Sequence, residues 1–167
     1  MNDTYVEVMV KRRTSPLLGP GRILCWALAI ACLLIAMLGN FVFFIGAIIF
    51  AAVAYFLSPM FDIEYEYLYL DREISIDKIM SKEKRKHVYT VDLNRMQVMA
   101  PVNSHELDSY RARGVKSYDF TSGEDDAKIY SIVYEGANEG VVLVNIEPDE
   151  QMLHAIKSVF PRKVLDF

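Results

Sequence analysis

The pattern of apolar and polar residues divides the chain into three parts. Residues 23–57 contain no Asp, Glu, Lys, Arg or His over 35 consecutive positions. One membrane crossing needs about 20 apolar residues, so this run is too long for one helix and suits two short ones. Gly39 and Asn40 tolerate the backbone angles of a tight turn. We therefore predict a transmembrane hairpin of two helices, over residues 23–38 and 41–57.

After the hairpin, the hydrophobic pattern changes to a period of two. In residues 62–70 an isoleucine and three tyrosines alternate with glutamates and a leucine, which predicts a strand with one aromatic face. Similar alternation predicts strands at 73–80, 87–93, 95–100, 115–120, 128–135 and 140–146. The charged stretch 81–86 is predicted to be a loop, and residues 102–114 to form one or two helical turns. Residues 58–167 are long enough for one compact domain.

A helix is predicted after the last strand. Residues 147–150 resemble a helix start, with Pro148 in the first turn and acidic residues at the positive end of the helix. One apolar face follows at helical spacing, made of Met152, Leu153, Ile156, Val159 and Phe160. The fold class is therefore an α+β membrane protein: a helical hairpin, then an antiparallel β-sandwich or barrel of about seven strands with a C-terminal amphipathic helix.

Residues 1–22 are predicted to be a separate N-terminal segment. Val6, Val8 and Val10 alternate with other residues, which favours a short strand, although an interfacial helix is also compatible with so short a pattern. The Gly-Pro-Gly sequence at 19–21 predicts a flexible lead-in to the hairpin.

Charges near the hairpin predict its orientation. Four basic residues precede it and none lies at its tip, so both chain ends are expected in the cytoplasm of a multi-pass cell-membrane protein. Arg22, Trp26 and Tyr55 are the expected membrane-interface anchors. A cleaved signal peptide, with small residues at 27–29, is the alternative reading of the first apolar segment. The length of the segment and the second apolar run that follows favour retention.

Composition excludes some functions. Residues 58–167 carry 14 basic and 20 acidic side chains, so a nucleic-acid-binding role is not expected. Cys25 and Cys32 both lie in the first apolar segment, which leaves the domain without a disulfide or a cysteine metal site. No pattern indicates a cofactor.

The line EYEYLYLDREISIDKIMSKEKRKHVYTVDLNRMQVM resembles bacterial membrane proteins with a domain like the pleckstrin-homology (PH) domain. Residues 67–72 match the end of a strand after the membrane hairpin in those proteins, and residues 91–96 match a later strand. The whole chain also resembles a family of small bacterial membrane proteins of unknown function. The resemblance implies a PH-like fold and no catalytic residue. It does not imply phosphoinositide binding, because the basic pattern of the eukaryotic domains is absent from the first hairpin.

One basic cluster and one set of triad-type residues are candidate sites in the sequence. Lys82, Lys84, Arg85 and Lys86 form the basic cluster of the domain, which would contact anionic lipid headgroups or, more simply, be a solvated loop. Ser104, His105 and Asp108 are the residue types of a hydrolase triad, but residues so close in sequence rarely have the required geometry. The scattered histidines match no metal-ligand spacing. No catalytic, cofactor or metal residue is predicted.

Three hypotheses for function follow. The first is a non-enzymatic, membrane-anchored PH-like scaffold that holds an unknown protein partner, or a second copy of itself, at the membrane. The second is anionic-lipid sensing through residues 82–86. The third is an enzyme whose site has no recognisable sequence pattern.

Overall fold

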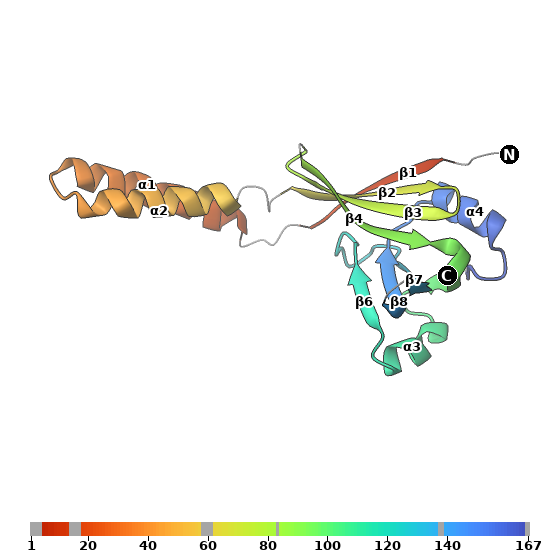
Figure 1. Ribbon diagram of the computed structural model, residues 1–167. Helices are drawn as coiled ribbons and strands as arrows, with labels where there is room; N and C mark the ends of the chain where they lie inside the picture. Colours follow the sequence, from red (N-terminus) through yellow and green to blue (C-terminus); the bar gives the residue numbers. More distant parts are fainter. Residues whose placement is uncertain (1–4, 14–17, 58–61, 83, 137–138, 166–167) are drawn as a thin grey trace. The chain divides into compact units, whose positions relative to one another are not determined.

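The computed structural model describes residues 5–13, 18–57, 62–82, 84–136 and 139–165. They fall into two compact units (Figure 1). One unit contains residues 13–63 and 79–84, and the other contains the described residues of 1–12, 64–78 and 85–167. The strands are β1 (Val6–Lys11), β2 (Ile63–Leu70), β3 (Glu73–Met80), β4 (Lys84–Asp92), β5 (Met96–Pro101), β6 (Lys116–Asp119), β7 (Tyr130–Gly136) and β8 (Gly140–Ile146). The α-helices are α1 (Leu18–Met37), α2 (Val42–Leu57), α3 (Asp108–Ala112) and α4 (Glu150–Val159), with short 3-10 helices η2 (Leu93–Arg95) and η3 (His105–Leu107).

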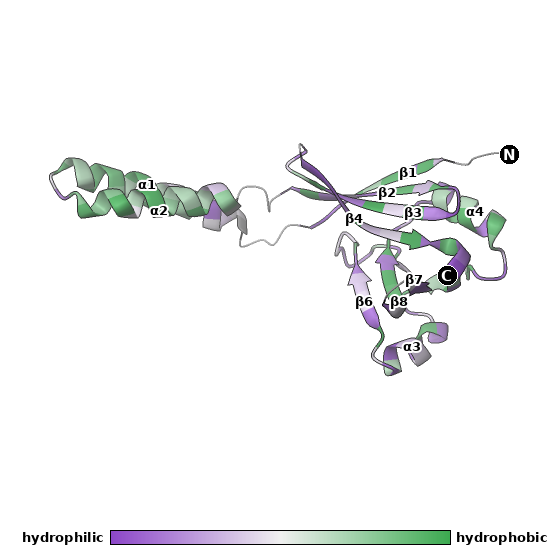
Figure 2. Cartoon of the chain, in the orientation of Figure 1, coloured by the Kyte–Doolittle hydropathy of each residue, from purple (hydrophilic) through white to green (hydrophobic). Residues whose placement is uncertain are grey.

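Helices α1 and α2 pack along each other as a hairpin of apolar residues (Figure 2). Their turn contains Gly39 with φ of 102°, a conformation that side-chain-bearing residues rarely adopt. Their buried side chains are small: Ala29, Ala36, Ala47 and Ala54. Small residues let the two helices approach closely.

The helix boundaries differ from the prediction at the first helix. Helix α1 begins at Leu18, so the Gly-Pro-Gly sequence forms its first turn and is not a flexible lead-in. Proline is tolerated there because the first-turn amides have no partner within the helix. By length and composition, α1 alone is a candidate membrane span among the described residues, over Gly19–Met37. The apolar part of α2, Val42–Phe56, is shorter. Because proline disfavours helix at the residue before it, Ser58-Pro59 is predicted to end the second helix, and these two residues lie outside the described residues.

The first sheet has the order β1-β2-β3-β4. Strand β1 is antiparallel to β2, with Val6 opposite Tyr69 and Lys11 opposite Glu64. The strand predicted at the N-terminus is therefore present, and it forms the edge of this sheet. In sequence, the two apolar helices are an insertion between two neighbouring strands.

The second sheet has the order β5-β7-β8-β6. Strand β6 runs parallel to β8, whereas β7 is antiparallel to both β5 and β8, so the sheet is mixed and the prediction of an all-antiparallel domain is wrong here. The reversal arises because η3 and α3 carry the chain from β5 to the far edge of the sheet. Leu107 of η3 is fully buried against Ala100, Val133 and Leu143.

The aromatic and aliphatic strand faces form the core. Tyr67 and Ile76 of the first sheet and Ile132 and Ile146 of the second are fully buried. Helix α4 adds Met152 and Ile156, both fully buried. The helix begins at Glu150, and the preceding residue, Asp149, is its N-cap. The Asp149 side chain accepts a hydrogen bond from the Met152 amide. Pro148 therefore precedes the helix and does not form its first turn. Val159, predicted on the apolar face, is 41% exposed.

Candidate functional site

The predicted basic loop is not a single loop. Lys82 lies in the β3–β4 turn with φ of 58°, while Lys84, Arg85 and Lys86 are the first three residues of β4. All four side chains are exposed. Arg85 donates from its guanidinium to Glu66 Oε1 at 2.6 Å, across strand β3. Arg85 is therefore an exposed cation paired with a buried carboxylate, which distinguishes it from the three exposed lysines of this cluster.

A backbone contact fixes where the β3–β4 turn lies in its unit. The Ser81 amide donates to the Asp62 carbonyl at 2.8 Å. Asp62 is five residues after Leu57, the last residue of α2. Five residues span at most about 18 Å. The β3–β4 turn, which contains Lys82, is therefore tied to the short segment that follows α2.

The face of the first sheet that carries Glu66 is polar. Glu66 is only 3% exposed, and burial raises the pKa of its carboxyl, with a further rise from its hydrogen bond with Glu7. Arg85 opposes this rise. On the next two strands, His87 Nδ1 lies 2.8 Å from Asp77 Oδ1.

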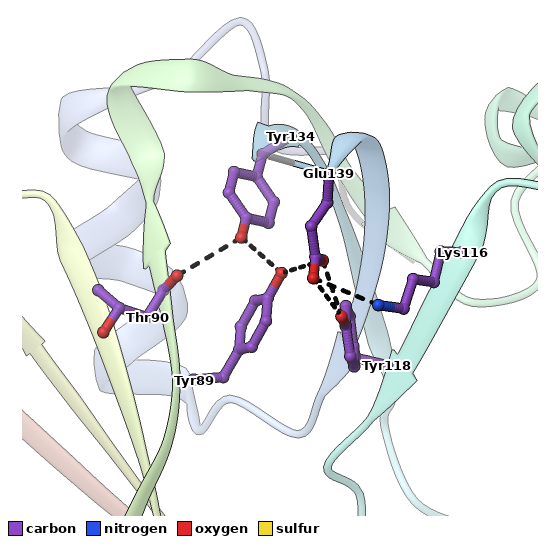
Figure 3. A network of polar contacts seen from close by, with 6 residues as sticks. All are labelled: Tyr89, Thr90, Lys116, Tyr118, Tyr134 and Glu139. Atoms are coloured by element: carbon purple, nitrogen blue, oxygen red, sulfur yellow. Dashed lines mark hydrogen bonds and ion pairs between the residues drawn. The ribbon is translucent and has the colours of Figure 1, made fainter. Parts of the chain in front are cut away.

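A second polar cluster connects the two sheets. Tyr118 Oη donates to both carboxylate oxygens of Glu139, at 2.9 and 2.7 Å, and Lys116 Nζ lies 3.2 Å from Oε1 (Figure 3). Tyr134 Oη donates to Tyr89 Oη at 2.8 Å. Tyr89 Oη in turn donates to Glu139 Oε2 at 3.5 Å. Residues from β4, β6, β7 and the β7–β8 turn thus converge on one carboxylate.

Aromatic contacts surround this cluster. The Tyr89 and Tyr118 rings have centroids 4.6 Å apart, and Tyr118 stacks on Phe120 at 6.3 Å. Phe120 also meets Tyr65 edge-on at 5.6 Å. Such ring pairs add stability beyond the area that they bury. The cluster therefore joins the β4 edge of one sheet to the β6 edge of the other.

The contacts within the cluster shift the pKa values of several of its members. Burial raises the pKa of Tyr89 and of Tyr134. The Tyr118 hydrogen bond, followed by that of Lys116, lowers the pKa of Glu139. The hydrogen bonds with Tyr118 and then Glu139 raise the pKa of Lys116. At neutral pH Tyr89 and Tyr134 are therefore protonated donors and Glu139 is ionised. Sequence reasoning missed the cluster because its members are distant in sequence.

Replacing Glu139 by Gln should lower stability slightly at pH 7 and have no effect in acid. The pKa of Glu139 is lowered on folding, so its ionised form stabilises the fold above the unfolded pKa of about 4.3, and this contribution is lost as pH falls through the folded value. Denaturant midpoints of the full chain in detergent, measured from pH 7 to pH 3, test this, with Glu106→Gln as an exposed control. A Glu139→Gln loss that persisted unchanged at pH 3 would contradict the ionic account.

The remaining candidates do not assemble into a reactive site. His105 is fully exposed and lies 3.1 Å from Asp108, while Ser104 Oγ accepts from the Glu106 amide and caps η3. The described residues contain no group of His, Cys, Asp and Glu able to hold a metal ion. Of the three predicted interface anchors, Arg22 lies in the second turn of α1 and Trp26 in its third turn, while Tyr55, 69% exposed, lies near the end of α2.

Comparison with known proteins identifies the family of this chain. Residues 2–166 match the family described as "Bacterial PH-like domain (DUF6106)". The chain belongs to this family. The match covers nearly the whole DUF6106 chain, helical insertion included, and confirms the PH-like resemblance seen in the sequence. No curated protein and no solved structure matches the chain.

Proposed function

We propose that this DUF6106 protein is a non-enzymatic interaction module held at the cytoplasmic face of the cell membrane by the α1–α2 hairpin. The observation that carries the proposal is the apolar surface of the two helices. Of the exposed large hydrophobic side chains among the described residues, all but Tyr5, Met9, Leu70 and Val159 lie between Ile23 and Phe56. A soluble protein rarely exposes a contiguous apolar surface of this extent, whereas a bilayer covers it.

Helix lengths fit a hairpin that crosses the bilayer with some local adjustment. The 20 residues of α1 span about 30 Å, the thickness of the hydrocarbon core. The 16 residues of α2 span about 24 Å. A short second crossing is accommodated by local thinning of the bilayer and by interfacial residues such as Tyr55. The basic residues before α1 favour a cytoplasmic position for both ends.

The edge strand supports retention of α1. Cleavage of a signal peptide near residues 27–29 would remove β1, which forms a six-residue pairing with β2 and buries Val6 and Val10. The sheet is complete only when the chain before the hairpin stays attached. The family adds to the non-enzymatic part of the proposal, because PH-like domains are generally non-enzymatic.

The anchor is tested by membrane partition. The full chain should remain in the membrane pellet after an alkaline carbonate wash. A matched variant in which residues 13–62 are replaced by Asn-Gly should stay in the supernatant, because Lys11 and Glu64 are directly opposite and a two-residue turn can join their strands. Release of the full chain by carbonate would refute the anchor.

Anionic-lipid contact is a second candidate, favoured by the position of the β3–β4 turn. Lys82, Lys84 and Lys86 are exposed, and the Ser81–Asp62 contact holds the turn near the end of α2. Each lysine near an anionic surface contributes about 1 kcal/mol to membrane attraction. An acidic domain with lysines at this one turn would orient that turn toward the headgroups.

The test uses the variant without residues 13–62, which keeps β1. It should bind vesicles containing anionic lipid at low salt, and the triple substitution of Lys82, Lys84 and Lys86 by Glu should abolish binding. Arg85→Gln is not a suitable probe, because it would leave the buried Glu66 without its cation. No binding by the unsubstituted variant at low salt would rule out this candidate.

A further inference from the structure

Strand β1 presents an open edge. It pairs with β2 on one side, and no strand among the described residues pairs with its other side (Figure 1). The edge of a strand carries a row of amide donors and carbonyl acceptors that can pair with a further strand. Helix α4 packs near the start of β1, where Tyr5, Val6 and His154 line a shallow groove.

The exposed side chains of β1 are complementary to those of a second, antiparallel copy of β1. Val6 and Val10 are buried toward the core, whereas Glu7, Met9 and Lys11 are on the opposite face and exposed. Met9 is 56% exposed. In two antiparallel copies of β1 centred on Met9, each Glu7 is opposite the other copy's Lys11, and the two Met9 side chains are opposite each other. Opposite charges directly across an antiparallel pair are stabilising.

Other symmetric registers are less favourable. A one-residue shift would turn the outer side chains of one copy toward the inner face of the other. Centring the pair on Glu7 places two carboxylates opposite each other, and centring it on Val8 places each Glu7 opposite Met9. The register about Met9 is the one that pairs both charges and buries the exposed methionine.

The surroundings of Glu7 favour an added cation. Glu7 accepts a hydrogen bond from Tyr5 Oη at 2.8 Å, and it also lies in hydrogen-bonding range of the buried Glu66. Two neighbouring carboxylates repel each other, and a lysine from a second copy would offset this repulsion. On the same face Lys11 is opposite Glu64 within its own sheet, so that lysine would lie between two acidic residues.

We propose that two copies of the protein pair through their β1 edges, antiparallel about Met9, to form one continuous eight-stranded sheet. The inference names a partner for the interaction module, and it rests on the proposed function for its setting at the membrane. Two chains anchored in one bilayer meet at a raised effective concentration, so a strand-edge contact of small area is sufficient. The contact is two-fold and closes on itself, so assembly stops at the dimer.

Cysteine crosslinking in membranes tests the register. The full chain with Cys25→Ala and Cys32→Ala is the background, and Met9→Cys in it should give a disulfide-linked dimer on mild oxidation, because directly opposite residues have Cβ atoms roughly 4.5–5.5 Å apart. A mixture of a Glu7→Cys chain and a Lys11→Cys chain, carrying different tags, should crosslink to each other. Either chain alone should not.

Charge exchange tests the ion pairs. Glu7→Lys or Lys11→Glu, each combined with Met9→Cys, should reduce the crosslinked dimer by about tenfold. The combined Glu7→Lys and Lys11→Glu exchange should restore it, which a folding defect would not do.

A monomer in the Met9→Cys chain, or self-crosslinking of the Glu7→Cys chain as strong as that of the mixture, would overturn the proposal. A chain that stays monomeric in the carbonate-washed pellet would overturn the pairing and leave the anchor intact.

Discussion

Removal of β1 is expected to abolish cooperative folding of the domain. The matched comparison is the chain in which residues 13–62 are replaced by Asn-Gly, with and without its first twelve residues. Val6 and Val10 are 8% and 9% exposed, and full burial of such a side chain is worth about 1.5–3 kcal/mol. Together with the paired backbone of β1, the loss is about 5 kcal/mol, which is close to the whole stability of a small domain.

The expected measurement is a urea unfolding curve followed by circular dichroism. The chain with β1 should show one cooperative transition. Without β1 the open β2 edge should cause aggregation or a loss of the transition, since an unpaired strand is a template for other chains. Equal midpoints for the two chains would show that β1 does not contribute to the fold. The same result bears on any study of residues 58–167 alone, which lack this strand.

The second large effect is expected at Tyr67, the buried link between the two sheets. Tyr67 is fully buried on β2, and its hydroxyl donates to the Phe120 carbonyl at 2.6 Å. Burial raises the pKa of this hydroxyl, so it remains a protonated donor. Tyr67→Ala should cost about 3–5 kcal/mol through the cavity that it leaves. Tyr67→Phe should cost about 1–3 kcal/mol, because a buried carbonyl loses its donor.

Tyr110→Phe is the matched control for Tyr67→Phe. Its hydroxyl donates to Gln97 at 3.1 Å in an exposed position, so its removal should change stability by less than about 0.5 kcal/mol. Urea unfolding of the soluble chain without residues 13–62 measures all three substitutions. If Tyr67→Phe were as mild as Tyr110→Phe, the bond between the sheets would not contribute to stability.

Local pattern predicted most of the elements but not how they pair. The seven strands between residues 62 and 146 are present because alternation of apolar and polar residues is a local property of each strand. The membership of β1 in the first sheet depends on pairing across the 51 residues between Lys11 and Ile63, which no local pattern reports. The parallel direction of β6 likewise depends on the path through η3 and α3.

Two predictions are wrong because the residue types concerned occur here against their usual preference. The Gly-Pro-Gly sequence at 19–21 was expected to break a helix, but at a first turn it is compatible with one. The basic residues 84–86 were expected in a loop, yet they begin β4, where Arg85 is stabilised by Glu66. The tyrosine cluster around Glu139 could not be predicted, because its side chains meet only when the two sheets come together.

Burial determines which positions in the domain are suitable for a topology probe. The sequence places Ser122 in a polar turn, where an introduced thiol would be expected to be accessible. In the structure Ser122 is only 5% exposed, and its hydroxyl donates to Glu147 at 2.7 Å. A cysteine there would be protected on either side of the membrane. His105 is fully exposed and gives an unambiguous position in the domain.

The central claim is that a membrane hairpin holds a cytoplasmic PH-like domain, and labelling of two cysteines tests it directly. In a chain with Cys25→Ala and Cys32→Ala, an impermeant thiol reagent applied to intact cells should label Asn40→Cys at the hairpin tip. It should label His105→Cys only after the cells are opened. Labelling of His105→Cys in intact cells, or protection of Asn40→Cys there despite labelling in opened cells, would contradict the account.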